Sequence, residues 1–188
     1  MKYLYKKFSI LLKADKQLSK EEKFQMHRLL VKMYPRFKNL FDKNEYFSTV
    51  RPQMNFLVKK AGELIGTGKF LWRNIKIKNE SIKLFAFGMV VAKRYQNQGI
   101  GTKIVALSIQ NAKKRKADLL YASTSNSKVK KMLSQLKFQI ITAPIFYKDV
   151  ISKDLTREKG AAYIFEFKPG LKEKINILTQ IYLGVGPI

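Results

Sequence analysis

The segment between residues 91 and 102 carries the residue types best suited to hold a phosphate group. Gln96, Gly99 and Gly101 form a Q-x-x-G-x-G pattern there. Glycine lets a backbone curl closely around a ligand, and a helix start presents unpaired N–H groups at the positive end of the helix dipole. Because the pattern lies between an apolar run and an amphipathic stretch, it predicts a pyrophosphate cradle at a strand-to-helix junction.

Two other phosphate-binding loops do not fit this segment. A Rossmann loop needs a third glycine and an acidic residue about 20 positions further on, at the end of a second strand. Asp118 is not in such a place. A Walker loop needs Gly-Lys-Ser/Thr with an earlier glycine at a fixed spacing, whereas Gly101 is followed by Thr102 and Lys103.

The periodicity around the cradle predicts the elements that position it. Residues 82–91 form a long apolar run typical of a buried strand, and residues 102–115 read as a helix. Further along, Val129, Met132, Leu133 and Leu136 repeat at the spacing of an amphipathic helix. The cradle therefore lies between a strand and a helix.

Strands and helices alternate in the rest of the chain. Ser19 and Glu22 have the spacing of a capping box and predict a helix over residues 19–33. Strands are expected over residues 3–12, 54–58, 64–72, 119–123, 138–141 and 161–167, with an irregular excursion over residues 143–160. This pattern predicts one α/β (α+β) domain over residues 1–170, followed by a tail over residues 171–188 that docks as a helix.

Two motifs together resemble the GNAT superfamily of N-acyltransferases. The family signature V-x-P-x-Y-R/Q-x-x-G-x-G/A is similar to residues 91–101. The later family motif N-x-x-A-x-x-L-Y-x-x-x-G-F matches in position the residues Asn126, Val129, Met132, Leu133, Lys137 and Phe138. The resemblance covers residues 54–167 and implies a mixed, mostly antiparallel sheet with helices on both faces.

Short matches point to one branch of the superfamily. Val50-Arg51-Pro52 and Leu155-Thr156-Arg157 are similar to segments of nodulation N-acyltransferases and aminoglycoside N-acetyltransferases. This similarity leaves both acetyl and longer acyl groups open.

The resemblance implies acetyl-CoA or another acyl-CoA as co-substrate, with no metal. Backbone groups of Met89, Val90 and Val91 would line the pantetheine and polarise the thioester carbonyl, and Asn126 would lie near the pantetheine arm. The residues implied for the pyrophosphate are Gln96, Asn97, Gln98, Gly99, Ile100, Gly101 and Thr102. The implied reaction is direct attack of a primary amine of a small molecule or peptide on the thioester.

The catalytic acid and base are not evident. Leu133 stands where the family usually has a tyrosine that protonates the thiolate, and Phe87 stands where some relatives have a carboxylate. Other candidates are Glu63, Tyr121, Asp149 and Glu166, each of which is also explained as an ordinary strand or loop residue. Tyr95, in the family's aromatic position, is expected to pack beside the cradle.

The net charge of the chain leaves several kinds of binding partner open. It has 188 residues, of which 38 are basic and 13 acidic, giving a net charge of +25. Such a charge attracts polyanions, so an acidic acyl carrier protein is an alternative donor. A non-catalytic module that binds nucleic acid or an anionic surface is a further alternative, although 31 of the basic residues are lysines rather than the arginines of specific recognition. A homodimer is left open.

Cysteine and histidine usage excludes several chemistries. The chain has no cysteine, and His27 is its only histidine, so thiol nucleophiles and a histidine-based metal site are not expected. The longest apolar run, over residues 84–92, is far shorter than the roughly 18 residues of a membrane span. Lysines interrupt the N-terminal segment where a secretory signal would be apolar, so we expect a cytoplasmic protein.

Overall fold

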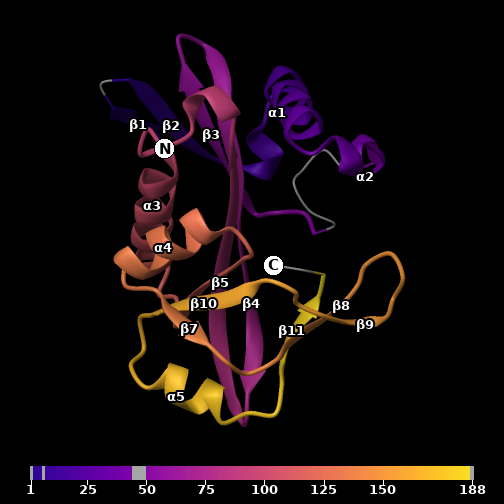
Figure 1. Ribbon diagram of the computed structural model, residues 1–188, viewed down its shortest axis with the longest axis vertical. Coiled ribbons are helices and arrows are strands. Elements are labelled where there is room, and N and C mark those ends of the chain that lie inside the picture. The colour runs from indigo at the N-terminus through magenta and orange to yellow at the C-terminus, as the bar shows by residue number, and fades with distance from the viewer. Residues whose placement is uncertain (1, 6, 44–49, 187–188) are drawn as a thin grey trace. The chain divides into compact units, whose positions relative to one another are not determined.

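A computed structural model describes residues 2–5, 7–43 and 50–186 (Figure 1). The chain divides into two compact units. Unit 1 comprises Met1–Leu71 and Gly88–Ile104, and unit 2 comprises Trp72–Phe87 and Val105–Ile188. Strands β4 (Glu63–Ile77) and β5 (Glu80–Val91) and helix α3 (Ile100–Lys114) contribute residues to both units.

Unit 1 contains an antiparallel sheet covered by two helices. Its strands pair in chain order, each antiparallel to the next: β1 (Lys2–Tyr5), β2 (Phe8–Ala14), β3 (Met54–Lys60) and the first part of β4. The helices are α1 (Lys20–Met33) and α2 (Lys38–Lys43). Three short 3₁₀ turns are η1 (Asp15–Gln17), η2 (Pro35–Phe37) and η3 (Lys93–Tyr95).

The core of unit 1 forms because α1 is apolar on one face. Met26 and Leu30 of α1 and Phe41 of α2 are almost completely buried, and they pack with Leu57 and Val90 of the sheet. Val90 lies near the end of β5, just before the segment that leads to the cradle. The core therefore fixes the strand end from which the cradle begins.

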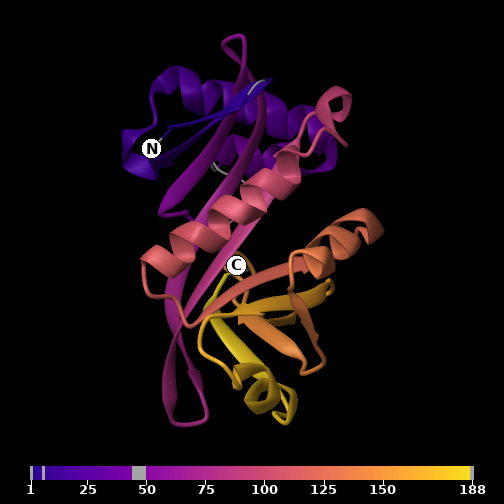
Figure 2. The ribbon, with the colours of Figure 1, turned by 90° about the vertical axis from the view of Figure 1, so that its left-hand side faces the viewer.

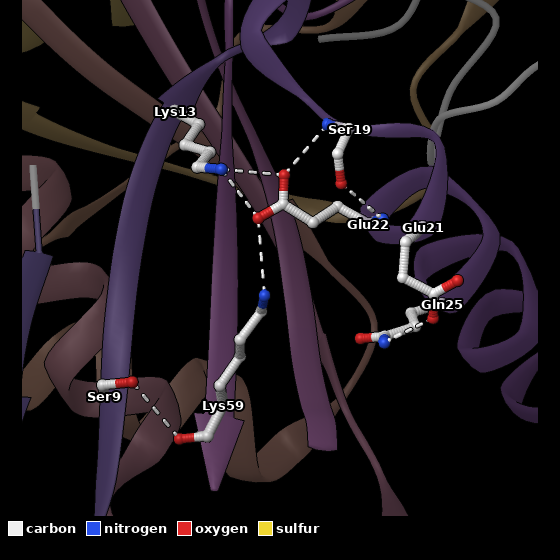
Figure 3. Close-up of polar contacts among 7 residues, drawn as sticks. All are labelled: Ser9, Lys13, Ser19, Glu21, Glu22, Gln25 and Lys59. Carbon is white, nitrogen blue, oxygen red and sulfur yellow. Dashed lines mark hydrogen bonds and ion pairs between the residues drawn. The ribbon is translucent and has the colours of Figure 1, made fainter. Parts of the chain in front are cut away.

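The capping box at the start of α1 is confirmed, and it includes a buried ion pair (Figure 3). The Ser19 hydroxyl accepts from the Glu22 N–H at 3.1 Å, and the Glu22 carboxylate accepts from the Ser19 N–H at 3.0 Å. Lys13 donates to both carboxylate oxygens at 2.8 and 2.9 Å, and Lys59 donates at 3.4 Å. Although burial opposes ionisation, the hydrogen bonds from Lys13 and Ser19 outweigh it and lower the pKa of Glu22.

Unit 2 contains a mixed sheet and a second, smaller sheet. In the larger sheet β5 pairs in parallel with β6 (Leu119–Thr124), and β10 (Ala161–Glu166) runs antiparallel to both β6 and β7 (Gln139–Ile141). The smaller sheet has the order β11 (Ile181–Val185), β8 (Ile145–Lys148) and β9 (Leu155–Arg157). The other helices of this unit are α4 (Ser127–Gln135) and α5 (Leu171–Asn176).

The prediction of an irregular segment over residues 143–160 is wrong, because β8 and β9 lie within it. These strands have four and three residues, and β8 pairs with β11, more than 30 positions further along the chain. The C-terminal segment is helical only in α5 and then becomes β11. Ile181 and Leu183 are buried by the alternation of this strand, while Tyr182 between them is exposed.

The predicted α/β class with a mixed, mostly antiparallel sheet and helices is confirmed. Among the strand pairs described for the larger sheet of unit 2, β5 with β6 is parallel and the two pairs of β10 are antiparallel. All pairs described for unit 1 are antiparallel. Among the residues that the structure describes, no helix has the length and apolar character to cross a membrane.

Candidate functional site

The segment between β5 and α3 forms an open loop of backbone donors. Figure 2 shows it as the pink turn that precedes the long helix α3. Asn97 and Gly99 both have positive φ, 60° and 76°, and side chains from Gln96 to Gln98 are exposed. Among the described residues, the backbone N–H groups of residues 97–102 have no hydrogen-bond acceptor, and the first such bond belongs to Lys103, which donates to the Gly99 carbonyl at 3.0 Å. We call residues 96–102 the cradle loop.

Two glutamines brace the cradle loop from within. Gln96 Nε2 donates to the Val91 carbonyl at 2.9 Å, and Gln98 Nε2 donates to the Arg94 carbonyl at 3.1 Å. The Gln96 N–H is itself bonded to the Lys93 carbonyl at 3.2 Å. Gln96 therefore supports the loop, while the open N–H groups begin one residue later. A run of six open donors at the start of a 15-residue helix suits a pyrophosphate.

Glycines on β4 allow close approach to the last residues of β5. A Cβ on Gly68 would lie 2.3 Å from the Gly88 carbonyl oxygen, and a Cβ on Gly66 would lie 3.1 Å from the Val90 carbonyl oxygen. The Ala92 N–H donates to the Ile65 carbonyl at 2.9 Å. The sequence analysis did not single out these glycines, although two glycines two positions apart in a strand signal a close backbone approach.

The three residues expected to line a pantetheine lie at the end of β5. Val90 is buried in the core of unit 1, whereas Met89 and Val91 are half-buried. The Val91 carbonyl accepts the Gln96 amide. The role of this backbone in binding a thioester stays a prediction.

Asn126 caps helix α4. Its Oδ1 accepts from the backbone N–H groups of Lys128 at 2.9 Å and Val129 at 3.4 Å, and its own N–H donates to Thr124 Oγ1 at 3.1 Å. The side chain is exposed. Capping uses the amide oxygen, so Nδ2 is the atom that could donate to a ligand.

Leu133 and Phe87, which stand where the family has polar residues, pack in the interior. Leu133 is completely buried, and Phe87 is 6% exposed with its ring edge-to-face against Phe138 at 6.0 Å between centroids. Phe138 continues the aromatic cluster to Phe165 at 5.6 Å. Neither side chain can carry a proton, as the sequence indicated.

Glu63 lies at the start of β4 and is paired with cationic and aromatic neighbours. Its carboxylate accepts from Arg94 and, at 3.4 Å, from the Tyr95 hydroxyl. Arg94 and Lys60 lie over the Tyr95 ring at 4.8 and 5.2 Å from its centroid, so the ring makes cation–π contacts with both side chains.

Glu63 also lines a cavity of about 500 Å³ in unit 1. Arg28, Lys32, Lys93 and Arg94 give it four cationic side chains, and Glu21 adds a second carboxylate. The Oε1 atom of Gln25, another lining residue, is buried without a partner within the described part of the chain. The cavity suits a ligand that carries negative charge.

Two other candidate carboxylates are engaged in local structure. Asp149 Oδ1 accepts from the N–H groups of Ile151 at 2.7 Å and Ser152 at 2.9 Å, which closes a turn after β8. Glu166 Oε1 accepts from the Lys172 N–H at 2.7 Å in the first turn of α5. Both bonds give these residues a structural role.

Tyr121 on β6 differs from the other candidates because its hydroxyl is buried and unpartnered. The residue is 1% exposed, and its hydroxyl has no hydrogen-bond partner among the described residues. A buried polar group without a partner costs about 1–3 kcal/mol. Burial first, and then the negative charge of Glu158, raise the pKa of the Tyr121 phenol. The Ser123 side chain lies close enough to lower it by hydrogen bonding, although no contact between the two has hydrogen-bond geometry.

Metal binding finds no support in these residues. Within residues 2–5, 7–43 and 50–186, no group of three or more His, Cys, Asp or Glu side chains could hold an ion. His27 Nε2 lies 2.8 Å from Asp42 Oδ1, which links α1 to α2.

The mostly antiparallel sheet has a strand end that leads through a loop of open backbone donors into a helix, an arrangement that suits a phosphate-bearing ligand. A family model described as the acetyltransferase (GNAT) family matches residues 20–138, and the chain belongs to that family. No curated protein matches the sequence.

Solved structures share the fold at low sequence identity. A ribosomal-protein-S5-alanine acetyltransferase from Vibrio fischeri is 14% identical, with 88% of this chain and 96% of that chain covered and a TM-score of 0.57. A GNAT-family acetyltransferase from Staphylococcus aureus Mu50 is 15% identical, with 84% and 98% covered and a TM-score of 0.55. A proposed acetyltransferase from Pyrococcus horikoshii is 18% identical with a TM-score of 0.55; the match covers 76% of this chain and 47% of that one, about half its length.

Membership of this family supports acyl-CoA-dependent N-acetyl transfer as the general activity, with acetyl-CoA as co-substrate. The cradle loop fits this co-substrate, because its open N–H groups can donate to a pyrophosphate.

Proposed function

We propose that this protein transfers an acetyl group from acetyl-CoA to a primary amine of a small molecule or peptide. The observation that supports this most strongly is the braced cradle loop with its run of open N–H groups from Asn97 to Thr102. In this proposal the loop holds the pyrophosphate, and the backbone of Met89, Val90 and Val91 lies along the pantetheine.

The reaction requires few groups from the protein. Acetyl-CoA supplies an activated thioester, so an amine can attack the carbonyl carbon directly. The C–N bond forms, the C–S bond breaks, and one proton passes from the amine nitrogen to the thiolate sulfur. The protein must orient the thioester, stabilise the carbonyl oxygen as it becomes negative, and accept the amine proton.

Long-chain transfer from an acidic acyl carrier protein is the second candidate, and the charge of the chain favours it. Unit 1 has 19 basic and 6 acidic residues, or +13, and unit 2 has 19 basic and 7 acidic residues, or +12. An acidic carrier would be attracted by either unit. A module that only binds nucleic acid would need the same charge but no cradle loop.

An acetyl-transfer assay tests the proposal. Purified protein is incubated with acetyl-CoA and a tripeptide with a free amino terminus, spermidine or an aminoglycoside, and free thiol and acetylated amine are measured. We expect both products in equal amounts with at least one amine. Equal or faster transfer from palmitoyl-acyl carrier protein at low salt, lost at high salt, would favour the second candidate. No transfer from either donor would reject the enzyme assignment.

A further inference from the structure

No step of the proposed reaction uses the cavity in unit 1 that Glu63 lines. The cavity lies between helix α1, the start of β4 and the segment that follows β5, and the described cradle loop contributes none of its lining residues. Its volume of about 500 Å³ is within the range of roughly 300–1,000 Å³ that small-molecule sites have. Every lining residue belongs to unit 1. A ligand could therefore bind here whether or not the protein transfers acetyl groups.

Buried leucines and more exposed polar residues line this cavity together. Leu29 and Leu64 are each 7% exposed, and both belong to the core of unit 1. The polar residues that α1 supplies are spaced by four, three and four positions, so they share one face of the helix; they are Glu21, Gln25, Arg28 and Lys32. The cavity can therefore hold a molecule that is apolar on one side and polar on the other.

The cationic side chains of the cavity exceed the acidic ones. Four cationic and two acidic side chains line it, which leaves a surplus of two positive charges. Arg94 is paired with Glu63. Arg28, Lys32 and Lys93 make no ion pair with any residue that the structure describes. These three side chains can therefore turn to an anion that enters the cavity.

Gln25 adds an acceptor that still needs a donor. Its Nε2 donates to Glu21 Oε1 at 2.7 Å (Figure 3), and this bond determines which end of the amide is the oxygen. The Oε1 atom is buried and has no hydrogen-bond partner within the described part of the chain. Because an unpaired buried acceptor is unfavourable, a ligand that brings an O–H group to this oxygen gains affinity.

We propose that the cavity binds a small phosphate monoester whose organic part carries hydroxyl groups. A phosphate monoester has a charge of about −1.5 to −2 at pH 7, which matches the surplus of two positive charges, whereas one carboxylate would balance only half of it. Lys32 and Lys93 hold the phosphate oxygens, and a ligand hydroxyl donates to Gln25 Oε1. The carbon skeleton lies against Leu29 and Leu64.

Calorimetric titration with glucose 6-phosphate tests this site, with inorganic phosphate and glucose as partial ligands. Each partial ligand offers one of the two polar contacts, so we expect glucose 6-phosphate to bind at least roughly tenfold more tightly than either. Lys32→Gln and Lys93→Gln should each weaken its binding roughly tenfold, the loss of one hydrogen bond to a charged group. No saturable binding of glucose 6-phosphate at millimolar concentration, or equal affinity for inorganic phosphate, would overturn the proposal.

Lys20→Gln is the matched control for the two lysine variants. Lys20 is an exposed residue of the same helix, and it does not line the cavity. Its replacement removes one positive charge, as Lys32→Gln does, so it measures the general attraction of an anion to a basic chain. We expect Lys20→Gln to bind glucose 6-phosphate as wild type does. An equal loss of affinity in Lys20→Gln and Lys32→Gln would overturn the proposal.

Gly99→Val separates this cavity from the cradle loop, which is the other place in unit 1 suited to a phosphate. We expect this variant to bind glucose 6-phosphate with wild-type affinity. Binding that is lost in Gly99→Val and kept in Lys32→Gln would place the phosphate on the cradle loop and overturn the assignment.

Gln25→Leu tests the hydroxyl contact, because leucine has a similar size and no polar atom in its side chain. We expect the preference for glucose 6-phosphate over inorganic phosphate to shrink roughly tenfold, while the affinity for inorganic phosphate stays the same. The midpoint of thermal unfolding should stay the same or rise, since a buried unpaired acceptor is removed. An unchanged preference would reject the contact and, with it, the hydroxyl-bearing class of ligand.

Discussion

Gly68 shows how one missing Cβ lets two strands meet in unit 1. A Cβ at this position would lie 2.3 Å from the Gly88 carbonyl oxygen, which is far inside van der Waals contact with backbone. We expect Gly68→Ala to destabilise the fold by about 2 kcal/mol, the range of overpacking a closely packed site. Chemical denaturation measures this free energy of unfolding.

Two other glycines provide a graded comparison for Gly68→Ala. Gly66→Ala should cost less, because its Cβ would lie 3.1 Å from the Val90 carbonyl oxygen. Gly62→Ala has open space but a φ of +82°, so it measures backbone strain alone. Equal stability of Gly68→Ala and wild type would show that β4 and β5 do not approach as described.

At the residue scale the sequence predicted the cradle loop better than the catalytic groups. Spacing and residue type were enough to predict a glycine loop between β5 and α3, because glycine marks the backbone conformation that such a loop needs. Phosphate binding by this loop stays a prediction. The burial of Tyr121 on β6 and the packing of Gly160 against that strand depend on tertiary contacts. Such contacts leave no local pattern, so no spacing rule could have predicted them.

At the scale of elements, Glu22 joins the start of α1 to two strands of unit 1 through Lys13 and Lys59 (Figure 3). We expect Glu22→Gln to destabilise the fold by about 2 kcal/mol at pH 7, since it removes one member of a buried ion pair. The pKa of Glu22 is lowered in the folded state, so its stabilisation is complete above the unfolded pKa near 4.5 and is lost as pH falls through the folded pKa.

The free energy of unfolding of wild type and Glu22→Gln, compared at pH 7 and at pH values below 4.5, checks this prediction. The difference should shrink in acid. Glu21→Gln is the control, because the neighbouring Glu21 is exposed and accepts one bond from Gln25. An equally large effect of Glu21→Gln would mean that the buried network does not stabilise the helix start.

The predictability of each element depends on how local its signals are. The capping box of α1 and the apolar run of β5 are encoded by neighbouring residues, and both were predicted. Strands β8, β9 and β11 are short, and β8 finds its partner in β11 only through the fold. The sequence pattern therefore predicted an irregular segment and a helical tail where the smaller sheet forms.

At the scale of the whole molecule, the net charge should govern how fast anionic ligands arrive. Both units are strongly basic, so the field does not depend on one patch. We expect the association rate of acetyl-CoA to fall roughly tenfold between low salt and 0.5 M salt, because screening removes electrostatic steering. Stopped-flow binding should show a much smaller change in the dissociation rate, and equal salt effects on both rates would argue against steering.

If the cradle loop binds acetyl-CoA, a side chain at Gly99 should weaken that binding, and calorimetric titration of Gly99→Val measures the effect. Gly62→Val is the matched control, since both glycines have positive φ, 76° and 82°, and open space around a Cβ. We expect micromolar binding for wild type and Gly62→Val, and at least roughly tenfold weaker binding for Gly99→Val, because a left-handed φ strains valine and turns the backbone donors away. Unchanged affinity in Gly99→Val, or no binding by wild type, would contradict it.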